Sequence, residues 1–288
     1  MANIRDLKTR YTSIGNIAQI TGAMEMVATT KLRRFQDRAI ASRPYAEQIG
    51  RLIQNLASAV DGDSHPLFEE KVVKKRGVLV TTSARGLCGS YNSNVFAKIR
   101  DHAKAHEGEE LHYFVIGKKG MSALPKRGYH VEFYFEDLNL EKVTFRDAAE
   151  IAQAGQRLFL ERGYDCLDVI YTAFQSQSRF EATSFQFLPM VPVQSEDEGS
   201  STRDYLLEPS PEAIFDSLVP KYLETRMFNA LIESLASEFA MRRISMKNAT
   251  EAASDMKKDL QKLYNRARQE RITKELLEIV GGAEALRG

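Results

Sequence analysis

Apolar residues recur at alternating intervals of three and four along the first sixty residues. Seventeen positions from Ile4 to Val60 follow this spacing. The polar exceptions among them are Thr21, Glu25 and Ser42. A heptad pattern of this kind is typical of a helix that packs against another helix. It predicts a helix over residues 3–60, which Pro44 should kink but not end, because the pattern resumes in phase after it.

The C-terminal end of the chain repeats the pattern over residues 209–288. Ser210 followed by Pro211 is typical of a helix N-cap and a proline in the first turn. From Phe228 the series continues at heptad spacing and changes register after Ala267, and Pro220 should add a second kink. The expected inward positions are Ile232, Leu235, Phe239, Arg242, Met246, Ala249, Ala253, Met256, Leu260, Leu263 and Ala267, then Ile272, Leu276, Ile279, Ala283 and Leu286.

These two helices are too long to lie inside a globular protein of this size. At 1.5 Å per residue they would measure about 90 Å and about 115 Å, whereas a compact chain of 288 residues is about 50 Å across. We therefore expect them to pair antiparallel and to project as a stalk. The apolar stretch from Ile272 to Leu286 would stand at its end, where another protein should enclose it.

The residues between the helices alternate short β-rich runs with helical ones. This rhythm predicts an α/β domain over residues 75–194 with a mostly parallel sheet. The expected strands are Gly77–Thr82, Leu111–Ile116, Val131–Phe135, Asp168–Phe174 and Phe180–Leu188, with helices near 90–106, 119–126 and 144–162. A polar loop over residues 194–204 should lead back to the last helix.

Composition excludes several classes of protein. With 43% hydrophobic and 27% charged residues, the chain is neither disordered nor fibrous. Cys88 and Cys166 match no metal or redox spacing, which favours buried structural thiols. No run of about 18 apolar residues and no signal peptide is present, so we expect a soluble protein that is not exported. A net charge of +1 argues against a dedicated nucleic-acid binder.

Two stretches of the middle segment could carry chemistry. The sequence ARGLCGSYN, from Ala84 to Asn92, lies where a strand gives way to a helix, as phosphate-binding loops do. Gly86 and Gly89 complete no nucleotide-binding motif, so a tight turn that needs glycine is favoured. His102 and His106 have a metal-ligand spacing with His112 nearby, but without a well-placed carboxylate a solvated helix face is favoured.

The stretch from Ile20 to Arg38 is unusual for a surface helix. Met24, Met26 and Val27 would lie on different sides of one helix, which indicates contacts from several directions. The cations of the long helices are either solvated or docked to acidic loops of a surrounding protein. These cations are Lys31, Arg33, Arg34, Arg38, Arg242, Arg243 and Arg268.

Four motifs together resemble the gamma subunits of bacterial F-type ATP synthases. They are AMEMVATTKLRR, SARGLCGSYN, LASEFAMRRISMKNAT and YNRARQERITKELLEIVGGAEAL. The resemblance covers the whole chain in order and spacing. It implies an antiparallel coiled coil of the two terminal helices and a Rossmann-like middle domain.

The resemblance also implies a function without catalysis or cofactor. The chain would be the central shaft inside three alpha and three beta subunits, with the epsilon subunit and the membrane ring of c subunits at its foot. Ion-driven rotation of the shaft would change the states of the beta subunits in turn. Association with the bacterial plasma membrane, on its cytoplasmic face, would come only through this complex, and no nucleic acid is implied.

Site residues follow from the same resemblance. The implied contacts with the beta subunits are Met24, Met26, Lys31, Arg33, Arg34, Arg242, Arg268, Gln269, Thr273 and Glu278. The implied apolar bearing at the tip comprises Leu276, Ile279, Val280 and Leu286. Three positions depart from the family's usual residues, namely Gly22, Ala84 and Arg243, and this leaves the contacts at those positions open.

Two other functions remain as alternatives. The first is a nucleotide-binding enzyme with its site near Gly86 to Asn92, dimerised through the helices. The second is a coiled-coil scaffold for nucleic acid, against which the near-neutral charge counts.

Overall fold

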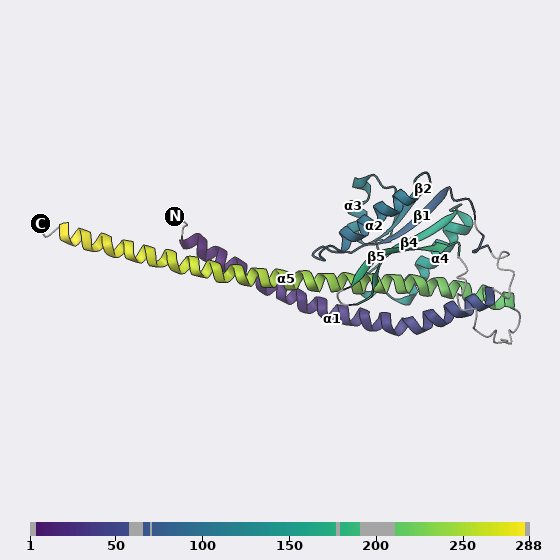
Figure 1. Ribbon diagram of the computed structural model, residues 1–288, viewed down its shortest axis with the longest axis horizontal. Helices are drawn as coiled ribbons and strands as arrows, with labels where there is room; N and C mark the ends of the chain where they lie inside the picture. The colour runs from purple at the N-terminus through teal and green to yellow at the C-terminus, as the bar shows by residue number, and fades with distance from the viewer. Residues whose placement is uncertain (1–3, 58–65, 70, 177–178, 191–210, 286–288) are drawn as a thin grey trace. The chain divides into compact units, whose positions relative to one another are not determined.

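The computed structural model describes residues 4–57, 66–69, 71–176, 179–190 and 211–285, and the chain divides into two compact units. The α/β unit spans residues 29–241, and the terminal helix pair comprises residues 1–28 and 242–288. The two expected long helices are α1 (Ile4–Ala57) and α5 (Pro211–Ala285), which both contribute to each unit (Figure 1). Residues 58–60, Ser210 and the loop over 194–204 lie outside the described residues.

The heptad pattern of the first helix is confirmed. Each of its expected inward positions from Ile4 to Ile53 is buried or half-buried. In the α/β unit the Phe35 ring stacks on Phe239 with centroids 5.5 Å apart, and Gly50 lies against the ring of Tyr222. The two helices are therefore antiparallel there. Both continue through their prolines, Pro44 and Pro220.

The helices are also antiparallel within the terminal helix pair, but one part of the expected register is wrong. Thr250 donates a hydrogen bond of 2.7 Å to Thr21. Met256 and Leu263, which were expected inside, are 52% and 53% exposed, and Lys257 and Tyr264 take the inner positions. Gly15 leaves room for the Lys257 stem, whose ammonium group lies 5.2 Å from the centre of the Tyr11 ring.

A five-stranded sheet forms the centre of the α/β unit. Its strands are β1 (Lys75–Thr81), β2 (Glu110–Ile116), β3 (Val131–Tyr134), β4 (Cys166–Phe174) and β5 (Phe180–Leu188). Their order is β3-β2-β1-β4-β5, and every pair is parallel except β4 with β5. The predicted α/β fold with a mostly parallel sheet is confirmed.

Helices cover both faces of this sheet, as its apolar strands require. On one face Val95 and Ile99 of α2 (Tyr91–Ala105) pack on Val78, Val80 and Val115. The other face carries α4 (Phe145–Glu161), which begins with a capping box formed by Thr144 and Asp147. Shorter helical segments are α3 (Lys118–Ala123) and the 3₁₀ turns η2 (Pro125–Arg127) and η3 (Leu140–Lys142).

Side chains of α5 accept hydrogen bonds from backbone amides near the end of β4. Strand β1 pairs with β4 only as far as Ile170, so the amides beyond that point need other acceptors. The amide of Thr172 donates to the Ser234 hydroxyl at 3.1 Å, and the amide of Phe174 donates to the Glu233 carboxylate at 3.3 Å. These bonds fix α5 to the sheet within the α/β unit.

Candidate interaction surface

The C-terminal part of α5 exposes apolar side chains that nothing in the described chain covers. Every residue from 271 to 283 is exposed. Figure 1 shows α5 continuing past the start of α1, so this part of the helix has no helical partner among the described residues. The large apolar side chains on it are Ile272, Leu276, Leu277, Ile279 and Val280, which are 47–68% exposed.

The expected bearing residues share one face of this helix. Leu276, Ile279 and Val280 are spaced three and four apart, so their side chains lie together on the surface. Leu286 lies outside the described residues. A contiguous apolar surface of this kind is typical of a site that another protein covers.

Polar residues of the same segment are held by contacts along the helix. Arg271 bonds Glu275 at 2.9 Å, and Lys274 lies 3.8 Å from Glu278. Pairs at this spacing stabilise a helix that has no neighbour. The expected contact residues Arg268, Gln269, Thr273 and Glu278 are all exposed, with Gln269 and Thr273 one turn apart on the same side.

Near the N-terminus, the apolar side chains point in several directions, as expected. Ala28 is buried, Met24 is half-buried, and Met26 and Val27 are 68% and 56% exposed. Ala28 belongs to the buried stripe of α1, whereas Met26 and Val27 lie outside that stripe. This surface is therefore open to contact from a side that α5 does not cover.

The expected cations of the helices fall into two groups. Arg33 and Arg34 are exposed. Lys31 bonds Glu141 at 2.6 Å and lies 5.4 Å from the centre of the Phe239 ring, and Arg242 is buried. Arg33 and Arg34 are therefore accessible to another protein, whereas Lys31 and Arg242 make their contacts within the chain. Sequence reasoning missed Glu141, because nothing in the sequence links η3 to α1.

Side chains of the glycine-containing loop after β1 form hydrogen bonds with one another. The Asn92 amide donates to the Ser83 hydroxyl at 2.7 Å and to the Cys88 sulfur at 3.2 Å. Gly89 has a φ of +56°, which favours glycine. The structure supports the tight turn that the sequence favoured, with its polar groups bonded to one another.

A buried polar cluster lies at the other end of the sheet, where the sequence had offered only a histidine pair. His102 of α2 bonds Asp168 of β4 at 2.7 Å, and Arg76 of β1 bonds the same carboxylate at 2.8 Å. Burial acts to raise the pKa of Asp168, but the His102 hydrogen bond and the Arg76 charge lower it overall. Burial and the Asp168 charge raise the pKa of the neighbouring Cys166 to about 12. Cys88 and Cys166 are both buried and free, as expected.

His112, which the sequence placed near His102 and His106, lies apart from them in the structure. It contacts Tyr164, Glu110 and Glu132, with Tyr164 packed among the side chains of the opposite face of the sheet. The expected solvated face is wrong for His102, which is 6% exposed.

Comparison with known proteins decides the family. A family model with the description "ATP synthase" matches residues 3–286. An ATP synthase gamma chain from Flavobacterium psychrophilum is 40% identical over the full length of both chains, and one from Chloroherpeton thalassium is 39% identical over 99% of each. The chain belongs to the ATP synthase gamma chain family.

Solved structures share the fold of this gamma chain family member. A chain of the Euglena gracilis mitochondrial ATP synthase, with a TM-score of 0.68 and 19% identity, is matched over 98% of this chain and 94% of that one. A chain of the Tetrahymena thermophila central stalk and c-ring structure has a TM-score of 0.58 and 24% identity over 80% and 99%. In the described parts of this chain, no helix is both long and apolar enough to cross a membrane.

Proposed function

We propose that the chain is the central rotor shaft of an F-type ATP synthase, without a catalytic site of its own. It would turn inside three alpha and three beta subunits and rest on the epsilon subunit and the c-ring. The observation that carries this proposal is the uncovered apolar end of α5, in a chain that belongs to the gamma chain family. A helix with this much exposed apolar surface is suited to an enclosing sleeve.

The mechanism is a shift of populations. Each beta subunit has open and closed states, and an asymmetric shaft favours one of them at each angle of rotation. The terminal helix pair is asymmetric, since α1 exposes the apolar Met26 and Val27 while α5 exposes the polar Arg268, Gln269 and Thr273. Synthesis or hydrolysis of ATP would take place on the beta subunits, driven by or driving ion flow.

Contacts with the beta subunits would come from the exposed members of the expected set. Arg268, Gln269, Thr273 and Glu278 offer polar groups along α5, and Arg33 and Arg34 offer charge on α1. Lys31 would first have to release Glu141 before it could bind an acidic loop. Met24 is half-buried, so only part of its side chain could contact a beta subunit, and Arg242 is buried. Leu276, Ile279, Val280 and Leu286 would form the apolar bearing.

The complex would place this chain at the cytoplasmic face of a bacterial plasma membrane. The chain itself would be peripheral, since it reaches the membrane only through the c-ring. The domain limits 1–60, 75–194 and 209–288 and the polar loop over residues 194–204 belong to the same proposal.

The test is coexpression of this chain with the alpha and beta subunits of its host. We expect one copy in a complex of three alpha and three beta subunits by native mass spectrometry, with ATP hydrolysis far faster than that of the same subunits without the chain. A chain that purifies as a homodimer and leaves the hydrolysis rate unchanged would contradict the proposal.

The apolar end provides a sharper version of this test. A triple variant with Leu276, Ile279 and Val280 replaced by Gln should assemble or couple poorly while its own thermal unfolding stays unchanged. Val72→Gln is the matched control, since Val72 is an exposed apolar residue of the α/β unit, 84% exposed. Equal losses in the triple variant and the control would show that the end of α5 has no special role.

A further inference from the structure

The described part of the chain holds two clusters in which histidines and a carboxylate approach one another closely enough to share a metal ion. The first consists of His102, His106 and Asp168, and we call it the α2–β4 cluster. The spacing of the histidines in the sequence suggested a metal site that lacked a carboxylate. The fold supplies one, because β4 brings Asp168 to His102 from 66 positions away along the chain.

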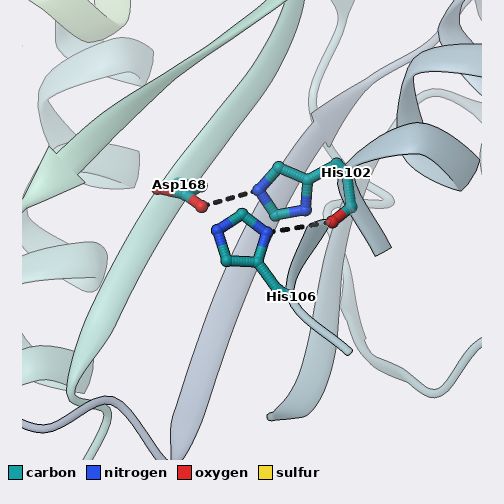
Figure 2. A group of neighbouring side chains, drawn as sticks. All are labelled: His102, His106 and Asp168. Carbon is teal, nitrogen blue, oxygen red and sulfur yellow. Dashed lines mark hydrogen bonds and ion pairs between the residues drawn. The ribbon is translucent and has the colours of Figure 1, made fainter. Parts of the chain in front are cut away.

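The donor atoms of the α2–β4 cluster converge. His102 Nε2 lies 2.7 Å from Asp168 Oδ2, and the two imidazole rings lie against each other with centroids 4.3 Å apart. Figure 2 shows both rings turned toward the carboxylate from one side. One donor atom from each of the three residues falls within 4.8 Å of the others.

The hydrogen bonds of His106 leave a nitrogen available. Its Nδ1 lies 2.9 Å from the backbone carbonyl of His102, and since a carbonyl only accepts, Nδ1 carries the proton. In the neutral ring Nε2 then holds the lone pair that a metal ion needs. A hydrogen bond from the other nitrogen to a carbonyl or carboxylate is the usual support of a metal-bound histidine.

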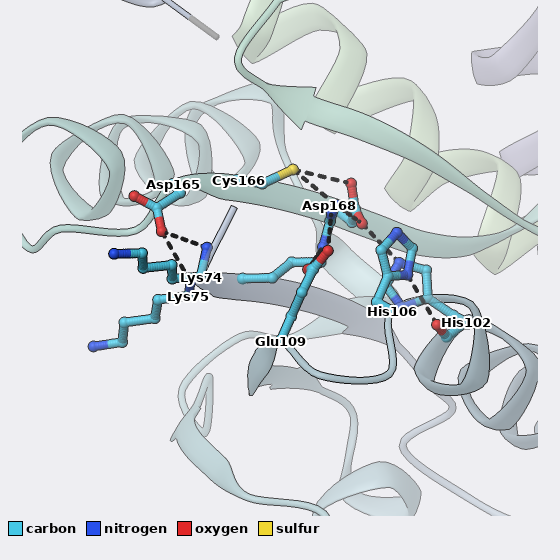
Figure 3. Close-up of polar contacts among 9 residues, drawn as sticks. Lys74, Lys75, His102, His106, Glu109, Asp165, Cys166 and Asp168 are labelled. Carbon is cyan, nitrogen blue, oxygen red and sulfur yellow. Dashed lines mark hydrogen bonds and ion pairs between the residues drawn. The ribbon is translucent and has the colours of Figure 1, made fainter. Parts of the chain in front are cut away.

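The surroundings of Asp168 provide the outer support and set the charge. Arg76 donates to Asp168 Oδ2 at 2.8 Å and also pairs with Glu109, and Cys166 lies beside them (Figure 3). With neutral histidines, the two carboxylates and one guanidinium leave one net negative charge for a cation to neutralise. Arg76 competes for the Asp168 charge, so the affinity should be lower than that of the same three ligands without the guanidinium.

We propose that His102, His106 and Asp168 bind a divalent transition-metal ion of the zinc class. Two imidazoles and one carboxylate suit zinc, copper, nickel or cobalt, whereas magnesium and calcium prefer oxygen ligands alone. Zinc bonds of about 2.0–2.2 Å place ligand atoms about 3.3 Å apart. His102 Nε2 and Asp168 Oδ2, which are 2.7 Å apart, would therefore separate as the ion replaces their hydrogen bond, and the His106 donor atom, within 4.8 Å of both, would adopt the same spacing. The ion would tie the last turn of α2 to β4.

His102 limits the strength of this site. Its Nδ1 is buried without a hydrogen-bond partner among the described residues. When Nε2 exchanges its hydrogen bond for a metal bond, the proton of the neutral ring moves to Nδ1, where it lacks an acceptor. This cost is a second reason to expect moderate affinity.

The second cluster, His112, His130 and Glu132, is a poorer site. Both ring nitrogens of His112 already have partners, Glu110 at 2.9 Å on Nε2 and Glu132 at 3.2 Å on Nδ1. His130 and Glu132 are exposed. A metal ion there would have to displace existing bonds and compete with water, so this cluster serves as the internal control.

The test is titration of the full-length chain, in its assembled complex, with Zn²⁺ against a chelating dye and with Co²⁺ by its visible absorption. We expect the chain to contribute one saturable site. His106→Gln should weaken binding by about 100-fold or more, since it removes a ligand. The matched control His130→Gln should leave the affinity unchanged. His106 is half-buried at the end of α2, so the variant should fold, which an unchanged melting temperature without metal would verify.

X-ray absorption on the unmodified, zinc-loaded complex gives a readout that needs no variant. The complex without this chain, measured in parallel, identifies zinc bound to other subunits. Two imidazoles with oxygen ligands at the site added by this chain support the proposal. The proposal is overturned by a zinc–sulfur shell, by no binding above that of the complex without the chain, or by binding that His130→Gln abolishes and His106→Gln preserves. None of these results bears on the shaft function, which the hydrolysis assay tests separately.

Discussion

The helix α5 lies in two different environments along its length. In the α/β unit, from Val219 to Ala240, most of its side chains are buried, including the polar Ser234, Ser237 and Glu238. In the terminal helix pair, only a narrow stripe contacts α1, and after Ala267 no described side chain is buried. The hydrophobic spacing of the two parts is similar, but their surroundings are not.

This difference separates what the chain stabilises by itself from what it leaves for a partner. Buried polar side chains are tolerated only where hydrogen bonds are supplied, and Ser234 finds its partner at the edge of β4. Exposed apolar side chains such as Ile279 gain nothing from folding of the chain alone. The first part of α5 is thus a component of a folded core, and the last part is a surface.

The largest expected effect comes from removing one leucine in each environment. Leu231 is fully buried, so Leu231→Ala should lower the free energy of unfolding by about 3–5 kcal/mol, through lost burial and the cavity left behind. Leu276 is 57% exposed, and Leu276→Ala should change it by less than about 0.5 kcal/mol. Chemical denaturation of the full chain followed by circular dichroism measures both. Similar losses would mean that the end of α5 folds back onto the chain in solution.

A second pair of variants compares buried and exposed ion pairs. Arg76→Met leaves Asp168 buried without its cation and should cost about 3 kcal/mol. Arg271→Met removes an exposed pair with Glu275 and should cost less than about 0.5 kcal/mol. Denaturation of the two variants in parallel checks this. If Arg271→Met were the costlier change, the exposed helix would depend on its surface charges far more than the structure indicates.

Much of the fold was predictable from the sequence because periodicity reports burial directly. Spacing of three and four identified both long helices, and the alternation of β-rich and helical runs identified all five strands. The exception was the register near Met256, where Gly15 and Tyr11 favour Lys257 on the inner face. That preference depends on the partner helix, so the pattern of one helix could not reveal it.

The sites were less predictable than the fold. Exposure of the apolar end of α5 followed from its length relative to α1. The hydrogen bond between His102 and Asp168 could not be predicted, because it depends on which residues of α2 and β4 face one another. The attachment of Lys31 to Glu141 was likewise set by the fold and not by any local motif.

A glycine in each unit should respond oppositely to the same substitution. Gly22 lies inside α1 in the terminal helix pair, and an added Cβ would meet only Thr250 at 3.9 Å, an ordinary contact. Gly22→Ala should therefore stabilise the chain by about 0.5–1 kcal/mol, since alanine favours helix. In the α/β unit, Gly117 has a φ of +94° and its added Cβ would clash with the Thr82 carbonyl, so Gly117→Ala should destabilise it. Thermal unfolding of both variants checks the signs, and a loss on Gly22→Ala would reveal a contact that this helix pair does not show.

The smallest effect concerns a buried carboxylate of α5 and appears in the dependence on pH. Burial raises the pKa of Glu233, although the Phe174 amide and the charge of Arg43 act to lower it. Because the folded chain binds this proton more readily than the unfolded chain, the stability from this group falls as pH rises from the unfolded pKa of about 4.3 through the raised folded pKa. Glu233→Gln should remove that fall while changing stability at neutral pH by less than about 0.5 kcal/mol, since the amide oxygen can still accept from Phe174.

Glu251→Gln supplies the control for this pH dependence in the terminal helix pair. Its carboxylate is exposed and lies 3.9 Å from the exposed Lys247 ammonium group, so the variant should change the free energy of unfolding by less than about 0.5 kcal/mol. Denaturant titrations at a series of pH values measure the slopes of both variants. If Glu251→Gln changed the slope and Glu233→Gln did not, the ionisable groups that matter for folding would lie in the exposed part of α5. The contrast between a self-sufficient core and a partner-dependent surface would then have to be abandoned.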